Sequence, residues 1–70
     1  MSSDHAELKN YLKEYRKKLG LTQDALAKKV QVSRKSINAV ENGVYVPSTV
    51  LALRIAKVLE CSVHDLFELL

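Results

Sequence analysis

Apolar residues recur at helical spacing along most of this 70-residue chain, and the pattern predicts five short helices. Leu8, Leu12, Tyr15 and Leu19 are separated by four, three and four positions, which places them on one face of a first helix. Gly20 follows them and can adopt the left-handed conformation that ends a helix. No segment alternates between apolar and polar residues over a length that predicts a strand. We therefore expect an all-α fold.

Two further helices are predicted on either side of a short turn. Thr22 and Ser33 are suitable N-caps for them, because a hydroxyl oxygen can accept a hydrogen bond from an N–H group of the first helical turn. The residues expected to face inward are Leu26, Ala27, Val30, Ile37 and Val40. Only residues 31–33 separate the two helices, so the helices must meet at a steep angle. This arrangement is typical of a helix-turn-helix.

The rest of the chain predicts a fourth and a fifth helix. Asn42-Gly43 ends the third helix, and Pro47-Ser48 begins the fourth. The residues that the fourth helix is expected to bury are Leu51, Ala52, Ile55, Ala56 and Leu59. Ser62 then begins a capping-box pattern at the start of a short fifth helix. The apolar residues of the fifth helix are Val63, Leu66 and Phe67.

The composition indicates one small globular domain. A hydrophobic fraction of 47% supports a single packed core, which we assign to residues 6–70, after a flexible N-terminus of residues 1–5. Cys61 is the single cysteine, which excludes an internal disulfide and suits a reducing cytoplasm. Because no export leader or long apolar run is apparent, we expect no membrane association.

Neither catalysis nor cofactor binding is indicated. Cys61 and His64 are three positions apart and could form a nucleophile–base pair, but no third orienting residue or oxyanion loop accompanies them. We interpret Cys61 as a buried structural thiol. The histidines and the cysteine match no zinc spacing, and the chain has no glycine-rich phosphate loop. We therefore expect no enzyme activity and no metal, cofactor or small-molecule ligand.

Charge is sorted along the chain. The formal net charge is +3, but residues 9–35 carry nine basic and two acidic side chains, whereas residues 36–70 carry two basic and four acidic ones. A lysine-rich face that is merely solvated is common, so charge alone leaves that alternative open. The sorting nevertheless matches a surface that faces a polyanion.

The third predicted helix presents polar residues opposite its buried face. Arg34, Lys35, Asn38 and Ala39 share that outer face, because residues four apart lie above one another. Arginine and lysine can bind guanine, asparagine can bind adenine, and an alanine methyl can contact a thymine methyl. Two cations at a helix N-terminus oppose the helix dipole, which favours an anion nearby. We therefore predict base contacts from these four residues.

Phosphate contacts are predicted around this helix. Gln23, at the first position of the second helix, is the main candidate, through its side chain and the nearby backbone amides. Ser36 and Asn42 are weaker candidates on the third helix and at its end. Tyr45 follows in the loop, where its hydroxyl could bind a phosphate or its ring could simply pack.

These residues resemble the Cro/C1-type, lambda-repressor-like helix-turn-helix family. The resemblance covers about residues 6–68, and its motif begins Leu19-Gly-Leu-Thr-Gln-x-x-Leu-Ala-x-x-Val-x-Val-Ser-Arg. The family implies a five-helix domain that binds operator DNA as a symmetric dimer. It also implies a phosphate-binding role for Gln23 and a structural salt bridge between Arg16 and Glu41. Two positions depart from the family pattern, since Gln31 and Glu60 stand where glycine is usual.

The sequence thus predicts a DNA-binding transcriptional regulator, specifically a repressor that binds a palindromic operator as a homodimer. Its third helix would enter the major groove of double-stranded DNA. The dimer interface is predicted at the apolar C-terminal region, through Val63, Leu66, Phe67, Leu69 and Leu70. The alternative is a protein-interaction module, antitoxin-like or coactivator-like, that uses the same fold.

Overall fold

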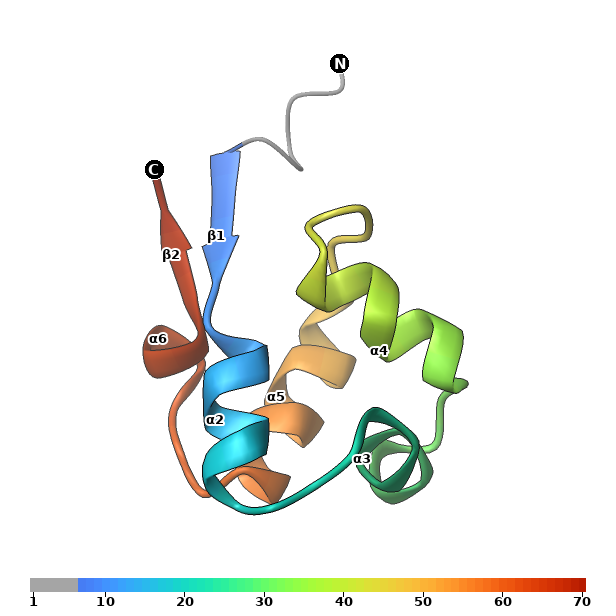
Figure 1. Cartoon of the computed structure of the whole chain (residues 1–70). Helices are drawn as coiled ribbons and strands as arrows, with labels where there is room; N and C mark the ends of the chain where they lie inside the picture. Colours follow the sequence, from blue (N-terminus) through green and yellow to red (C-terminus); the bar gives the residue numbers. More distant parts are fainter. Residues whose placement is uncertain (1–6) are drawn as a thin grey trace.

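The computed structural model describes residues 7–70, in which five helices surround one core and two short strands pair beside it (Figure 1). The helices are α2 (Leu12–Lys18), α3 (Gln23–Val30), α4 (Arg34–Glu41), α5 (Thr49–Val58) and α6 (Val63–Leu66). The strands are β1 (Leu8–Asn10) and β2 (Phe67–Leu69). The predicted five-helix fold is confirmed. The N-terminus that we expect to be flexible, residues 1–5, lies outside the described residues.

Hydroxyl side chains begin four of the helices. The hydroxyl oxygens of Thr22, Ser33, Ser48 and Ser62 each accept a hydrogen bond from a backbone N–H three residues later. At α6 the Asp65 carboxylate also accepts from the backbone N–H of Ser62, at 2.9 Å, which completes the capping box. The bond from the Ser62 backbone N–H to this carboxylate is the main cause that lowers the pKa of Asp65 below its ordinary value. The predicted helix starts are therefore confirmed at these positions.

The core lies between α2, α3, α4 and α5, and α6 closes one end of it (Figure 1). Side chains that are fully buried in it are Leu12, Leu26, Val30, Ile37, Val40, Ile55 and Leu66. All of them except Leu12 and Leu66 come from α3, α4 and α5, so this core holds the helix-turn-helix rigidly. The inward faces predicted for these helices are confirmed.

The first helix is shorter than predicted, because its expected first turn is a strand. Residues 8–10 pair with β2 in antiparallel register, with Leu8 opposite Leu69 and Asn10 opposite Phe67. Asn10 accepts a hydrogen bond from the N–H of Leu12 and donates from Nδ2 to the carbonyl of Val40, at 2.9 Å. These bonds begin α2 at Leu12 and tie β1 to α4. The prediction of no strand was wrong.

The same pairing changes the predicted fifth helix. The helix α6 ends at Leu66, and Phe67 adopts extended backbone angles as the first residue of β2. Three-residue strands at opposite ends of the chain are too short for an alternating pattern to reveal. Their pairing also depends on a contact across the whole fold. The correction therefore concerns two short segments and leaves the helical core unchanged.

Two non-glycine residues adopt the left-handed backbone conformation after helices. Gln31 has φ of 64° in the turn between α3 and α4, and Glu60 has φ of 59° after α5. These are the two positions that depart from the family pattern. A side chain in this conformation is strained by about 1–2 kcal/mol. The chain therefore keeps the usual turn geometry without the usual glycine.

We expect Gln31→Gly to stabilise the protein by about 0.5–1 kcal/mol. Glycine removes the strain of the left-handed conformation, and its larger unfolded-state entropy offsets part of the gain. Urea denaturation followed by circular dichroism measures the change. Gly20→Ala is the matched reverse change, because Gly20 has φ of 72° and no atom lies within 4 Å of the added methyl. It should destabilise the protein, and a neutral result for both variants would contradict this account.

Candidate nucleic-acid interface

The helix α4 presents a mainly polar face to solvent. Ile37 and Val40 are buried against the core, so the opposite side of the helix faces outward. Arg34, Lys35 and Asn38 are exposed on that side, and Ala39 is half-buried. Within residues 7–70, neither Arg34 nor Lys35 forms an ion pair. The two cations at the N-terminal end of α4 are therefore available to an anion.

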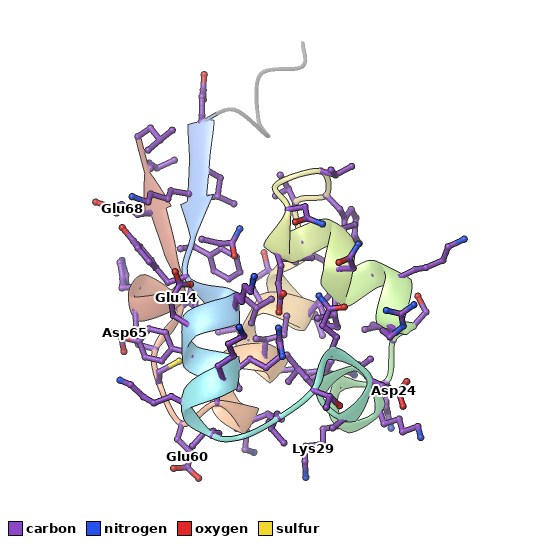
Figure 2. All side chains as sticks on the ribbon, in the orientation of Figure 1. Glu14, Asp24, Lys29, Glu60, Asp65 and Glu68 are labelled. Atoms are coloured by element: carbon purple, nitrogen blue, oxygen red, sulfur yellow. The ribbon has the colours of Figure 1, made fainter. Side chains whose placement is uncertain are left out.

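Acidic side chains are kept away from this face or are neutralised. Figure 2 shows Glu14, Asp65 and Glu68 on the side of the molecule opposite α4. Of the two acidic residues on α3 and α4, Asp24 lies 3.2 Å from Lys28, and Glu41 is paired with an arginine of α2. Charge repulsion therefore does not prevent α3 and α4 from approaching a polyanion.

The residue paired with Glu41 is Arg16, and the pair is buried. Arg16 Nε donates to Glu41 Oε2 at 2.6 Å, and Nη2 donates to Oε1 at 3.2 Å. The two side chains are 9% and 4% exposed. Arg16 Nη1 also donates to the carbonyl of Leu21, at 2.8 Å, just before α3. One guanidinium therefore links α2, α4 and the segment that leads into α3.

Gln23 joins this ion pair to the outer face of α4. Its Nε2 donates to Glu41 Oε1 at 2.9 Å and to Asn38 Oδ1 at 3.1 Å. This link was not predicted from the sequence. The three-residue spacing of Asn38 and Glu41 on one helix indicates that they can share a neighbour, but only the packing of α3 against α4 identifies Gln23 as that neighbour.

These bonds change how Gln23 could bind a phosphate. Both hydrogens of its side-chain amide are already donated within the protein. The backbone N–H groups of Gln23 and Asp24 have no acceptor within residues 7–70, because the first turn of a helix lacks intrahelical partners for them. The structure thus leaves the backbone at the start of α3 as the donor for a phosphate.

The weaker phosphate candidates are spread along α4 and its following loop. The Ser36 hydroxyl lies 3.1 Å from the Ser33 hydroxyl, at the cap. Asn42 is exposed at the C-cap of α4. The backbone N–H groups of Val44 and Tyr45 both donate to the carbonyl of Ala39, which fixes the loop against the end of α4. The Tyr45 side chain is 44% exposed.

The residues predicted for a dimer interface differ widely in exposure. Leu66 is fully buried within its own chain, so it offers no surface to a partner. Val63 and Phe67 are half-buried, whereas Leu69 and Leu70 are 78% and 80% exposed. The side chain of Leu66 faces the core because α6 is a single turn that packs against α5. The prediction was wrong in treating Leu66 as part of an exposed stripe.

Apolar surface on α5 was also not predicted from the sequence. Val50 and Leu53, three residues apart on one face of α5, are 58% and 56% exposed. Leu53 and Phe67 line an open groove of about 270 Å³ between α5, α6 and the strands. The other lining residues are Leu8, Val46, Pro47, Thr49, Ala52 and Val63. This apolar surface, from α5 to the sheet, is a candidate site for a protein partner.

Cys61, which is predicted to be a buried structural thiol, is partly buried and packs against the core. Burial, together with the nearby Asp65 carboxylate, raises the pKa of its thiol above the ordinary value. A catalytic cysteine needs the opposite shift, because the thiolate is the nucleophile. His64 is exposed and forms no side-chain hydrogen bond within the described residues. The arrangement therefore lacks an activated nucleophile.

Residues 7–70 contain neither a candidate metal site nor a candidate membrane span. No three histidine, cysteine or carboxylate side chains in this part of the chain lie close enough to hold a metal ion together. None of its helices has the length and apolar character needed to cross a membrane.

Comparisons with known proteins identify what this arrangement is similar to. A family model described as helix-turn-helix (HTH_3) matches residues 12–66. An uncharacterized HTH-type transcriptional regulator of Methanocaldococcus jannaschii is 50% identical over 60 residues, which cover 86% of this chain and 91% of that protein. The P22 c2 repressor in complex with a synthetic operator has a TM-score of 0.73 and 36% identity, over 76% of this chain and 80% of that one.

A further structure with a similar fold is SinR, the master regulator for biofilm formation, in complex with DNA. Its TM-score is 0.71 and its identity is 31%, over 76% of this chain and 86% of that chain.

Proposed function

Because this chain belongs to the HTH_3, Cro/C1-like family of helix-turn-helix transcriptional regulators, which are not enzymes, we propose that it is a cytoplasmic repressor that occupies a palindromic operator. The observation that carries the proposal is the free polar face of α4. Arg34 and Lys35 are exposed and unpaired within residues 7–70, on a helix held rigidly by a buried face. In a major groove, such a helix can contact base edges.

The two contact classes have different roles in this proposal. Arg34, Lys35, Asn38 and Ala39 contact bases and supply specificity. The backbone at Gln23 and the polar groups of Ser36, Asn42 and Tyr45 contact phosphates and set the position of α4 on the duplex. Two similar proteins with solved structures, P22 c2 repressor and SinR, are in complex with DNA. This similarity supports DNA as the partner.

A second copy of the chain is needed for adequate specificity. An eight-residue helix such as α4 is about 12 Å long, which spans only about three or four base pairs at 3.4 Å each. A twofold dimer doubles that contact and places two copies of α4 about 34 Å apart, in successive major grooves. We assign the interface to the apolar surface that includes Val50, Leu53, Phe67 and Leu69, since all four side chains are at least partly exposed.

We expect Leu53→Glu to convert a dimer of this chain into a monomer. A carboxylate in the apolar groove would lose its hydration when the surfaces meet. Leu19→Glu is the matched control, because Leu19 is also an exposed leucine but lies at the end of α2, beside Leu21 and Val58. Size-exclusion chromatography with light scattering measures the mass. A wild-type monomer at high micromolar concentration would contradict the proposed dimer.

Salt dependence of duplex binding tests the proposed function as a whole. The affinity should fall linearly on a logarithmic scale, by about a thousandfold between 50 and 200 mM salt if about six phosphates are contacted. Selection of bound duplexes from a random pool should then give a palindromic sequence. Negligible binding to any duplex at low salt would instead favour a protein-interaction module with the same fold.

A further inference from the structure

Four polar side chains from three helices form a continuous hydrogen-bonded relay that ends at the outer face of α4. Arg16 on α2 binds Glu41 on α4, Glu41 accepts from Gln23 on α3, and Gln23 donates to Asn38 on α4. We infer that this relay determines which polar group of Asn38 is presented to a DNA base. The first three residues are then positioning residues for sequence specificity. The inference rests on the proposed function.

The orientation of both amides follows from the charge on Glu41. A carboxylate paired with arginine only accepts hydrogen bonds, so the Gln23 atom that lies 2.9 Å from it must be Nε2. The same nitrogen lies 3.1 Å from a polar atom of the Asn38 amide. Because Nε2 donates, that atom must be an acceptor, and Oδ1 is the acceptor of the Asn38 amide. Turning either amide over would place two donors or two acceptors together.

The relay therefore leaves a donor on the surface. Asn38 is exposed, and its Nδ2 forms no hydrogen bond within residues 7–70. In the major groove, guanine and thymine offer acceptors and adenine offers N7, whereas cytosine offers only the N4 donor. We expect the wild-type chain to disfavour cytosine at the base that Asn38 contacts.

Glu41→Gln should reverse this polarity. Arg16 Nε needs an acceptor at the closer position, 2.6 Å away, so the new amide would place its oxygen there and its nitrogen towards Gln23, and the longer bond from Arg16 Nη2, at 3.2 Å, would be lost. Gln23 would then turn its oxygen inward, where it would accept from the new amide and from Asn38 Nδ2. Asn38 Oδ1 would now face the groove. An acceptor there disfavours guanine, which offers only acceptors on this edge.

Selection of bound duplexes from a random pool, with the 70-residue chain, tests this reversal. Asn38→Ala identifies the contacted base pair as the one at which preference is lost. At that base pair, Glu41→Gln should change the preference between guanine and cytosine by about fivefold or more. Preferences at the other base pairs should stay as in the wild type. Weaker binding with an unchanged preference at that base pair would overturn the inference.

Glu14→Gln is the matched control. It makes the same carboxylate-to-amide change and removes the same single negative charge. Glu14, however, is exposed on α2 and has no side-chain bond within the described residues. It should leave every base preference unchanged. A shift equal to that of Glu41→Gln would show that net charge, and not the relay, causes the effect, and would also overturn the inference.

Gln23→Ala keeps the proposal testable if Glu41→Gln does not fold. This change removes the middle of the relay and leaves the buried ion pair intact. With either of its polar groups free to face the groove, Asn38 should lose discrimination between guanine and cytosine at its own base pair. If Gln23 serves only as a phosphate ligand, all sequences should weaken equally, and that result would overturn the relay.

The free protein provides a test without DNA. Nuclear magnetic resonance can follow exchange of side-chain amide protons with water. Both Gln23 protons should exchange several-fold more slowly than those of Asn42, which is exposed and forms no side-chain bond within residues 7–70. Equal rates would overturn the relay. If the wild type selects no DNA sequence, the proposed function fails, and this measurement still decides whether the relay exists.

Discussion

Arg16→Met should destabilise the protein by about 3–5 kcal/mol, which is most of the stability of a domain of this size. The change leaves the carboxylate of Glu41 4% exposed and without its cation. It also removes the bond from Nη1 to the carbonyl of Leu21. We expect a protein that is largely unfolded at 37 °C. Thermal and urea denaturation, followed by circular dichroism, measure the loss.

A double variant separates the cost of an unpaired charge from loss of the arginine itself. Arg16→Met combined with Glu41→Leu replaces the buried ion pair by two apolar side chains. Such replacements are often neutral or stabilising, because no charge remains buried. The double variant should therefore recover a large part of the stability lost by Arg16→Met. No recovery would show that the single change acts through packing, which would refute the electrostatic explanation.

Arg34→Ala should weaken binding to the selected operator by about 1–3 kcal/mol, or roughly 5- to 150-fold. The loss should come with relaxed preference at one base pair, because a base contact distinguishes sequences and a phosphate contact does not. Fluorescence anisotropy with the operator and with single-base variants measures both effects. Equal losses on operator and random duplexes would contradict the proposed base contact.

Arg54→Ala is the matched control for this measurement. It removes the same side chain and charge, but Arg54 is exposed on α5, beside Lys29 and Lys57 rather than on α4. Only a small, sequence-independent loss is expected from it, through the overall field of the protein. A loss as large and as sequence-dependent as that of Arg34→Ala would place the specific interface elsewhere.

Local signals explain why most of the fold could be predicted from the sequence. Thr22 and Ser33 are caps whose bonds reach only three residues along the chain. Ile37 and Val40 mark the buried side of α4 by spacing alone. The strand at Leu8 was not predicted because it forms only by pairing with residues at the other end of the chain. The helical spacing of the apolar residues of α2 also continues back to Leu8, which favoured a helix there.

The candidate site could be predicted only as a set of exposed residues. Arg34 and Asn38 follow from the helical period of α4, since the opposite face is apolar. The hydrogen-bond partner of Asn38 could not be predicted in this way, because Gln23 contacts Asn38 only through the packing of α3 against α4. The interface prediction failed at Leu66 for a related reason, since one turn of helix has no period that tells an inward leucine from an outward one.

The pairing of β1 with β2 has a consequence for the order of folding. Contacts within α3 and α4 are local, whereas the strands join residues about 60 positions apart, and closing such a loop from an unfolded chain is entropically costly. The packed helices bring the strands close together and remove most of that cost, so we expect the sheet to form after the transition state. Changes in the strands should therefore accelerate unfolding and leave the folding rate almost constant.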